Sequence, residues 1–411
     1  MTMTKDLLFA GIKVLDIASF IAGPGAATAL SDFGADVIKV EPPGAGDLQR
    51  TLAYLPPNPR ARANYAWHLT NRNKRGMAIN LKSPGGTEIL ERLVKWADVL
   101  ITNYPQAARK KLHLTYGEVA AWNPRIVYAD FTGFGNAGPD AALPGFDITA
   151  YWARSGLLAM TRDAGAPPTL PVEGSGDYAS AMGLYSAVVS GLYFRERTGR
   201  GTCVGTSLLA HGIWAAGTLV SGALAGGKFY GLHDRKQPPN PLINPYATAD
   251  DHWLMLVASP PHWPGLANAI GHPELLKDPR FTDPQAIAQN SRALTEILDR
   301  AFASRPVAQW KQALDHARVT YGIVQTPEEA AHDPQLRAND IIVPLEGVDE
   351  LDSTISSPIT VLASPKIPAK RAPGLGEHND EILAELGFSR GDIDGFRSAG
   401  VIPPTAVPRP V

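Results

Sequence analysis

Short apolar runs rich in β-branched residues recur along the first third of the chain, and stretches with helical spacing separate them. The runs lie at residues 12–17, 36–41, 97–103 and 126–131. Between the first two, Gly23 and Gly25 flank Pro24 and open a helical pattern that ends at Gly34. Strands joined by helices pair in parallel, because each helix returns the chain to the same end of the sheet. The pattern therefore predicts an α/β fold with a Rossmann-like, doubly wound parallel sheet.

The first strand-to-helix turn resembles the phosphate-binding turn of dinucleotide-binding proteins, with Glu41 as the acid that ends the second strand. The match is incomplete, since Thr28 stands where the third glycine should be and Pro24 stiffens the turn. A tight turn with a packing role explains the glycines at least as well. A nicotinamide-dependent dehydrogenase therefore ranks last among the functional hypotheses.

Two glycines flank a serine just before a carboxylate in the stretch from Gly174 to Asp177. Helical spacing of apolar residues follows and ends at Gly199. Asp177 thus lies at the start of a long helix, where aspartate is a common N-cap. A carboxylate in a glycine-lined recess is also suited to act as a nucleophile. The local pattern leaves both alternatives open.

Charge and apolar content exclude several classes of protein. The 411 residues carry a net charge of −2, and no run of Lys or Arg is long enough to follow a nucleic-acid backbone. No apolar run reaches membrane-spanning length, and residues 1–6 contain no apolar signal region. The single Cys203, which we expect to be buried in a strand, excludes an intrachain disulfide and suits a reducing compartment. We therefore expect a cytoplasmic protein without nucleic-acid or membrane partners.

Five basic side chains follow predicted strands closely enough to meet phosphates at the carboxyl edge of the sheet, where open α/β sheets bind ligands. They are Lys74, Arg75, Lys82, Arg109 and Lys111. Taken singly, each is also explained as a solvated surface charge.

Motifs spread over nearly the whole chain resemble the class III CoA-transferases, the family of formyl-CoA transferase, crotonobetainyl-CoA:carnitine CoA-transferase and α-methylacyl-CoA racemase. In family order they include residues 11–16, 22–24, 33–42, 46–47, 133–135, 144–147, 176–177, 198–201 and 374–378. The resemblance implies a Rossmann-like large domain, a small α+β domain and an interlocked homodimer.

The order of the patterns predicts a large domain that is interrupted by the small one. We expect a first CoA-binding segment at residues 1–225, a Pro-rich linker at 226–245, the small domain at 246–330 and a return segment at 331–411. A hairpin within 246–258 and helical patterns at 262–270, 292–303 and 307–317 support the small domain. A further helix is expected from residue 208 to about residue 225.

The resemblance assigns the nucleophile to Asp177. It implies contacts to CoA by Ile21, Ala22, Ile79, Lys82, Asn103, Tyr104, Lys111, Gly133, Phe134 and Gly135. Acyl-CoA enters as a substrate, and no permanently bound cofactor and no metal are expected. Relative to formyl-CoA transferase, Ile21 replaces a glutamine and Pro42 replaces a CoA-binding arginine. A substrate pocket with Phe146, Tyr151 and Trp152 suits a larger or less polar acid, although these rings are equally explained as core packing.

Two activities follow from the resemblance. The first is transfer of CoA from an acyl-CoA donor to a carboxylic acid acceptor, through aspartyl anhydride and aspartyl-CoA thioester intermediates. The alternative is an α-methylacyl-CoA racemase or epimerase, which needs an acid and a base beside the α-carbon. Racemases of the family carry histidine between Gly and Asp, and here the motif reads Gly145, Phe146, Asp147. Phenylalanine cannot move a proton, so CoA transfer is favoured. A member that binds CoA without turnover is disfavoured because Asp177 is present.

Overall fold

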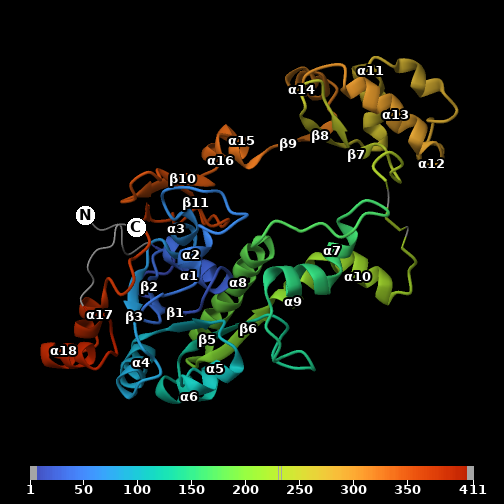
Figure 1. Ribbon diagram of the computed structural model, residues 1–411. Coiled ribbons are helices and arrows are strands. Elements are labelled where there is room, and N and C mark those ends of the chain that lie inside the picture. Colours follow the sequence, from blue (N-terminus) through green and yellow to red (C-terminus); the bar gives the residue numbers. More distant parts are fainter. Residues whose placement is uncertain (1–6, 230, 233, 405–411) are drawn as a thin grey trace. The chain divides into compact units, whose positions relative to one another are not determined.

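The computed structural model describes residues 7–229, 231–232 and 234–404, which form two compact units (Figure 1). The first unit comprises residues up to 159, residues 170–225 and residues from 337 onward. The second comprises residues 160–169 and 226–336. The range 226–245, expected as a linker, therefore falls within the second unit. A strand already begins there at Ile243, because Ile243 pairs with Val257 of the next strand.

A six-stranded sheet forms the centre of the first unit. Its order is β3-β2-β1-β4-β5-β6, the order of doubly wound dinucleotide-binding folds. The strands are β1 (Lys13–Ile17), β2 (Asp36–Glu41), β3 (Arg75–Ala78), β4 (Val99–Thr102), β5 (Val127–Thr132) and β6 (Thr202–Ser207). Every neighbouring pair runs parallel. The predicted α/β fold with a parallel sheet is confirmed.

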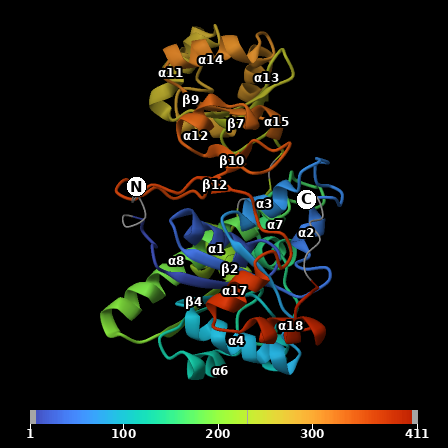
Figure 2. The same ribbon diagram turned by 90° about the vertical axis from the view of Figure 1, so that its left-hand side faces the viewer.

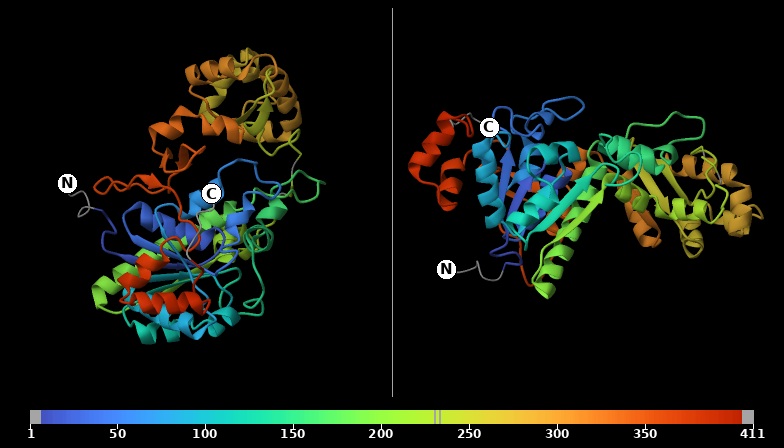
Figure 3. Two further views of the ribbon diagram at one scale, coloured as in Figure 1. Left: turned by 60° about the vertical axis from the view of Figure 1, so that its left-hand side comes forward. Right: turned by 90° about the horizontal axis from the view of Figure 1, so that it is seen from below.

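Helices cover both faces of this sheet. One face is covered by α4 (Pro84–Trp96), α6 (Tyr116–Trp122), α17 (Asn379–Glu385) and α18 (Arg390–Ser398), and the other by α1 (Ala22–Asp32) and α8 (Ser175–Thr198). In β1, Leu15 and Ile17 pack on the first face and Val14 on the second. Because alternate residues are buried on opposite faces, the strands read as continuous apolar runs in the sequence. Figure 3 shows α8 running beside the sheet.

The start of α4 follows from its sequence. The hydroxyl of Ser83 accepts a hydrogen bond from the backbone N–H of Gly86, and Pro84 occupies the first helical turn, where its missing N–H is harmless. The helix buries Ile89, Leu90 and Leu93 along one face.

The C-terminal part of the first unit returns to the sheet, with α17 and α18 beside α4 (Figure 2). The side chain of Asn379 accepts a hydrogen bond from the N–H of Ala78 and donates one to its carbonyl, which anchors α17 to β3. A second sheet of order β11-β10-β12, which the sequence patterns did not indicate, precedes these helices. Its strands are β10 (Ile342–Glu346), β11 (Ser353–Ile355) and β12 (Ala369–Lys370).

The remaining elements of the first unit are short, and two of them, α7 and α16, include residues of both units. They are α2 (Gln49–Leu52), α3 (Tyr65–Asn71), α5 (Gln106–Lys111), the π-helix η1 (Asp147–Ala153), α7 (Leu157–Met160), α9 (Leu208–Ala215), α10 (Gly217–Leu224) and α16 (Pro334–Ala338). The helix expected from residue 208 to about residue 225 is therefore two helices, separated at Ala216.

The second unit has its own sheet and core. The predicted hairpin is confirmed, since β7 (Ile243–Ala247) and β8 (Trp253–Val257) pair antiparallel, and β9 (Thr320–Val324) adds a third strand that was not predicted. The helices are η2 (Pro260–His262), α11 (Trp263–Ala269), η3 (Pro273–Lys277), α12 (Pro284–Gln289), α13 (Ser291–Phe302), α14 (Val307–His316) and α15 (Pro327–Ala331). Stacked Tyr246 and Phe302 rings, with Trp310, lie in this core.

Cys203 lies on β6 and is exposed, so the expectation that it is buried is wrong. The reason is topological: β6 is an edge strand of the large sheet, and its residues before Ser207 alternate between half-buried and exposed. Among the described residues, we find no helix with the length and apolar character needed to cross a bilayer.

Candidate active site

The glycine-rich stretch before α8 makes a tight turn into the helix. Gly174 has a φ of +78°, a left-handed conformation that glycine adopts without strain. A Cβ at this position would also lie 2.9 Å from Cδ1 of Ile21. Gly174 is the N-cap and Asp177 is the third helical residue, so the alternative in which Asp177 caps the helix is wrong.

The carboxylate of Asp177 is half-buried beside this turn. In the described part of the chain, no donor is hydrogen-bonded to its oxygens. Burial raises the pKa of Asp177 from its ordinary value of 3.8 to about 7, and the charge of Asp147 adds to the shift. A carboxylate that is poorly solvated and more basic than usual is a better nucleophile than one in water.

The second carboxylate of the site belongs to Asp147, the first residue of η1. Its side chain is 6% exposed, and neither oxygen has a hydrogen-bond partner within the described residues. Burial raises the pKa of Asp147, and the nearby N–H groups of Gly174, Gly176 and Asp177 only partly oppose the shift. A Cβ at Gly176 would lie 2.2 Å from Oδ1 of Asp147. The approach of the two carboxylates therefore depends on glycine at this position. π-helices such as η1 are rare in proteins, and those that occur are frequently found at functional sites.

The loop between β1 and α1 lies against the start of α8 through Ile21. Upstream, the side-chain amide of Asn103 donates to the carbonyl of Ser19 (2.7 Å) and accepts from its N–H (2.9 Å). The next residue, Phe20, has a φ of +65°, which is costly for a residue with a side chain. Ala22 is buried at the first position of α1.

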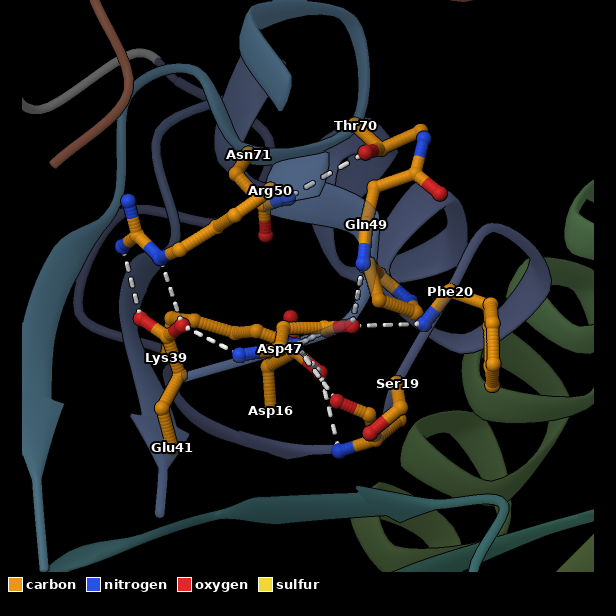
Figure 4. A network of polar contacts seen from close by, with 12 residues as sticks. Asp16, Ser19, Phe20, Lys39, Glu41, Asp47, Gln49, Arg50, Thr70 and Asn71 are labelled. Carbon is orange, nitrogen blue, oxygen red and sulfur yellow. Dashed lines mark hydrogen bonds and ion pairs between the residues drawn. The ribbon is translucent and has the colours of Figure 1, made fainter. Parts of the chain in front are cut away.

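A network of buried charges supports this loop (Figure 4). The ammonium group of Lys39 lies 2.8 Å from Oδ2 of Asp47 and 3.7 Å from Oδ1 of Asp16, and all three side chains are fully or almost fully buried. The other oxygen of Asp47 accepts from the N–H of Phe20 at 3.1 Å. Burial lowers the pKa of Lys39, but the carboxylates of Asp16, Asp47 and Glu41 outweigh it, so the pKa is raised and Lys39 stays charged.

A pocket of about 330 Å³ opens where β2, β3 and β4 end. Its lining includes Val40 and Glu41 from β2, Ile79 and Lys82 after β3, and Tyr104 after β4. The carboxyl ends of parallel strands are where doubly wound sheets bind nucleotides. Tyr104 follows Asn103 in the chain, and Asn103 holds the loop that reaches α8. A continuous series of contacts thus joins the pocket to the Asp177 side of the sheet.

The three predicted pocket aromatics occupy different environments. Phe146 is 57% exposed, and the indole of Trp152 donates to the hydroxyl of Ser175 at 3.2 Å. Tyr151 is 9% exposed and belongs to the core under α1 and α8, where its ring packs close to Gly176. Phe146 and Trp152 therefore border the start of α8 with accessible surface, while Tyr151 supports it from below.

Comparison with known proteins gives the family. Residues 9–379 match the family model described as CoA-transferase family III. The chain belongs to this family. It is 31% identical over 396 residues to cinnamoyl-CoA:phenyllactate CoA-transferase of Clostridium sporogenes, covering 94% of this chain and 95% of that one.

Further relatives have other substrates in their names. The human succinyl-CoA:glutarate CoA-transferase is 29% identical, covering 95% of this chain and 89% of that one. A crystal structure of a CAIB/BAIF family protein from Brucella suis superposes with a TM-score of 0.83 at 28% identity, covering 93% of this chain and 100% of that one. These similarities show that the chain is a family III CoA-transferase, but they do not identify its donor and acceptor acids.

Most of the basic residues considered for phosphate binding in this CoA-transferase are engaged elsewhere. Lys74 is buried against Asp16 at 2.8 Å, and Arg109 is buried against Asp130 at 2.5 Å. Arg75 pairs with Asp36, Glu381 and Glu385. Lys82 and Lys111 are exposed, and only Lys82 lines the pocket, whereas Lys111 precedes the lining residue Leu112. Lys74, Arg109 and Arg75 therefore form ion pairs with acidic residues of the fold.

Residues 133–135 of the transferase lie apart from the pocket lining. A Cβ at Gly133 would lie 2.7 Å from Cα of Gly145, and the ring of Phe134 packs close to Gly145. This loop therefore packs against the segment that leads to Phe146 and Asp147. Gly135 has a φ of +99°, which requires glycine.

Glu41 is not available to the ribose of a dinucleotide, because Arg50 donates to both of its carboxylate oxygens at 2.8 Å.

Several site residues of the transferase were missed as functional candidates. Asp147 appeared only as part of a motif, Asp47 only as a match to the family, and Phe20 not at all. The places of these residues in the site arise from contacts between distant segments of the chain. Only the glycines near Asp177 gave a local sequence signal for the site. In the described residues, no cluster of His, Cys, Asp and Glu side chains is arranged to hold a metal ion.

Proposed function

We propose that this enzyme moves CoA from an acyl-CoA donor to a carboxylic acid acceptor through covalent intermediates on Asp177. The observation that carries the proposal is the carboxylate of Asp177, half-buried, without a hydrogen-bond donor and with a pKa raised to about 7. Structural carboxylates are normally paired or hydrogen-bonded, so an unpaired one at a glycine turn favours a chemical role.

In the first half-reaction, a carboxylate oxygen of Asp177 attacks the thioester carbonyl of the donor. The carbon–sulfur bond breaks, CoA leaves as the thiolate, and an acyl-aspartyl anhydride remains. The thiolate then attacks the Asp177 carbonyl of the anhydride, which forms aspartyl-CoA thioester and releases the donor acid as carboxylate.

The second half-reaction reverses these steps with the acceptor acid. Its carboxylate attacks the aspartyl-CoA thioester and releases CoA thiolate, and the thiolate attacks the acceptor acyl carbon of the new anhydride. The products are the acceptor acyl-CoA and free Asp177. Electrons and protons balance without a redox partner, and thioester energy is retained throughout.

The pocket at the ends of β2, β3 and β4 suits the nucleotide part of CoA. Ile79 offers a buried apolar surface, Tyr104 a half-buried ring and Lys82 an exposed charge for phosphate. From there the thiol arm would pass Asn103, Ile21 and Ala22 to Asp177. The contacts assigned to Lys111, Gly133, Phe134 and Gly135, the interlocked homodimer and the cytoplasmic location stay predictions from the family resemblance and the sequence.

Isotope exchange tests the proposal without knowledge of the natural substrate pair. An acyl-CoA is mixed with its own ¹³C-labelled free acid, and label entering the acyl-CoA is followed by mass spectrometry. The covalent route predicts exchange that needs Asp177, and a hydroxylamine-sensitive adduct on the peptide that contains Asp177. Exchange by Asp177→Asn, with no deamidation to aspartate, would contradict the proposal.

Racemisation is the second candidate, and it shares the Asp177 position. It requires a group beside Asp177 that exchanges the α-proton, and Phe146 occupies the place of the family histidine. A chiral 2-methylacyl-CoA in deuterated water decides between them. Deuterium at the α-carbon in the absence of any free acid would favour the racemase.

A further inference from the structure

Phe20 is held in an unfavourable backbone conformation by the buried charge network. Its N–H donates to Oδ1 of Asp47 at 3.1 Å, and Oδ1 also accepts from the N–H of Gln49 at 3.0 Å. Oδ2 of the same carboxylate lies 2.8 Å from the buried ammonium group of Lys39. Asp47 is therefore fixed on both sides, and it in turn fixes Phe20 at a φ of +65°. Non-glycine residues in this region persist only where surrounding contacts impose them, and they cluster at ligand sites.

The side chain of Phe20 points away from the charge network that holds its backbone (Figure 4). Its ring meets the ring of Phe146 edge to face, with centroids 6.0 Å apart and planes at 89°. Phe20 is half-buried and Phe146 is 57% exposed, so the pair keeps accessible aromatic surface. Two rings from distant segments thus form one apolar wall.

This wall lies beside the nucleophile. Phe146 directly precedes Asp147, and the charge of the Asp147 carboxylate helps to raise the pKa of Asp177. Ile21 directly follows Phe20 and packs against Gly174, the N-cap of the helix that carries Asp177. The two rings therefore lie close to the start of α8, where an acyl group joined to Asp177 would be held.

The charges around the site disfavour a second carboxylate on the substrate. The charge of Asp147 helps to raise the pKa of Asp177, and the charge of Glu173 helps to raise the pKa of Asp147, so both of these charged neighbours are negative. A dicarboxylate would bring its free end into like charge, whereas an apolar chain would bury surface against the rings.

We infer that Phe20 and Phe146 form an aromatic wall that selects apolar monocarboxylic acyl groups, and that Asp47 is the positioning residue that sets this wall. The inference rests on the proposed covalent function and adds the substrate class and two residues to it. Phe20 is a specificity-determining residue, since its strained backbone carries the ring that meets Phe146.

Exchange between an acyl-CoA and its own labelled acid measures the selectivity. The probes are phenylacetyl-CoA, 4-methylpentanoyl-CoA, acetyl-CoA and succinyl-CoA, each with its acid. We expect kcat/KM for the first two to exceed that for the last two by at least about 10-fold, the discrimination that an apolar pocket provides for one or a few methylene groups. Phe20→Ala and Phe146→Ala should each remove most of this ratio, because kcat/KM for the two apolar probes falls more than kcat/KM for acetyl-CoA and succinyl-CoA.

Two further variants separate positioning from general damage. Phe20→Gly tolerates the positive φ, so it should lose selectivity at a Tm equal to or above that of wild type. Asp47→Asn keeps an acceptor for the Phe20 N–H but loses the charge that Lys39 binds, so it should lower selectivity in the wild type and leave it unchanged in a Phe20→Ala background. Phe194→Ala is the matched control, since Phe194 is a part-exposed phenylalanine of α8 about 25 Å along the helix from Asp177.

The outcomes separate the inference from the function on which it rests. Exchange that depends on Asp177 but is fastest with succinyl-CoA, or that keeps its selectivity in Phe20→Ala, overturns the inference and leaves the function intact. An equal effect of Asp47→Asn on all four probes in both backgrounds overturns the positioning role. Absence of exchange with every probe in a folded wild type that binds CoA overturns both.

Discussion

Replacing Asp177 by asparagine should abolish acyl exchange and stabilise the folded protein at alkaline pH. Burial, with a smaller effect from Asp147, raises the pKa of Asp177 from 3.8 to about 7. One pKa unit corresponds to about 1.4 kcal/mol, so ionising Asp177 in the folded state costs at most ~4 kcal/mol. Because Asp177 keeps part of its surface in water, solvent screening reduces this cost, and we expect ~1–2 kcal/mol.

The sign of the pH dependence follows from the direction of the shift. The pKa of Asp177 is higher in the folded state than in the unfolded state, so the neutral acid favours folding. This contribution is fully present below about pH 4 and is lost as the pH rises through about 7. Asparagine keeps the shape without the charge. The Tm of Asp177→Asn relative to wild type should therefore increase between about pH 4 and 7, by roughly 2–4 °C per kcal/mol.

Activity should show the complementary profile. Only the carboxylate attacks a thioester, so kcat/KM of wild type should rise about tenfold per pH unit below pH 7 and level off above it. Asp147→Asn is the matched control: it removes the neighbouring charge, keeps the nucleophile and should move the rise in kcat/KM to lower pH. A Tm difference that does not change with pH, together with a rise in activity near pH 4, would refute the raised pKa.

Three other perturbations test the parts around this carboxylate. Gly176→Ala should lose activity and stability by roughly 1–3 kcal/mol, because its Cβ would lie 2.2 Å from Asp147; exchange rates and thermal unfolding measure both, and near-native values would contradict the close approach. Lys39→Met leaves the buried Asp47 without its cation and should destabilise the protein by roughly 3–5 kcal/mol, measured by urea unfolding. Lys311→Met, at an exposed lysine, is the control, and a smaller loss of stability for Lys39→Met than for Lys311→Met would argue against the network. Lys82→Ala should weaken CoA binding about 3–10-fold at low salt and less at high salt, since its exposed charge is screened; titration calorimetry at two salt concentrations checks this, and a salt-independent effect would place the phosphates elsewhere.

Local sequence patterns were sufficient to predict the strands of the central sheet. Strands buried on both faces must be apolar along their whole length, so β1, β2, β4 and β5 are visible as runs without any knowledge of their partners. The start of α4 is equally local, because Ser83 and Pro84 satisfy the first turn within four residues. The glycines before Asp177 are a local requirement of the turn, and they indicated the candidate nucleophile.

Pairings between distant segments were decided only by the tertiary structure. Sequence showed Lys74 and Arg109 as free charges, yet each is buried against a carboxylate 58 and 21 positions away. The same holds for Asp147, whose burial depends on how η1 meets the first turn of α8. Desolvation and Coulomb interactions depend on spatial distance, which a one-dimensional pattern does not contain.

The sequence by itself predicted the parallel sheet, the long helix after Asp177 and the carboxylate that we propose as the nucleophile, because each gives a pattern within a short stretch of the chain. The tertiary structure decided what that carboxylate experiences. It placed Asp147 beside Asp177, used Lys39 and Asp47 to hold Phe20 in a conformation that its own sequence disfavours, and left Cys203 on an open edge of the sheet. These properties arise when segments far apart in the chain exclude water together, and the free energy of that exclusion belongs to the assembled fold.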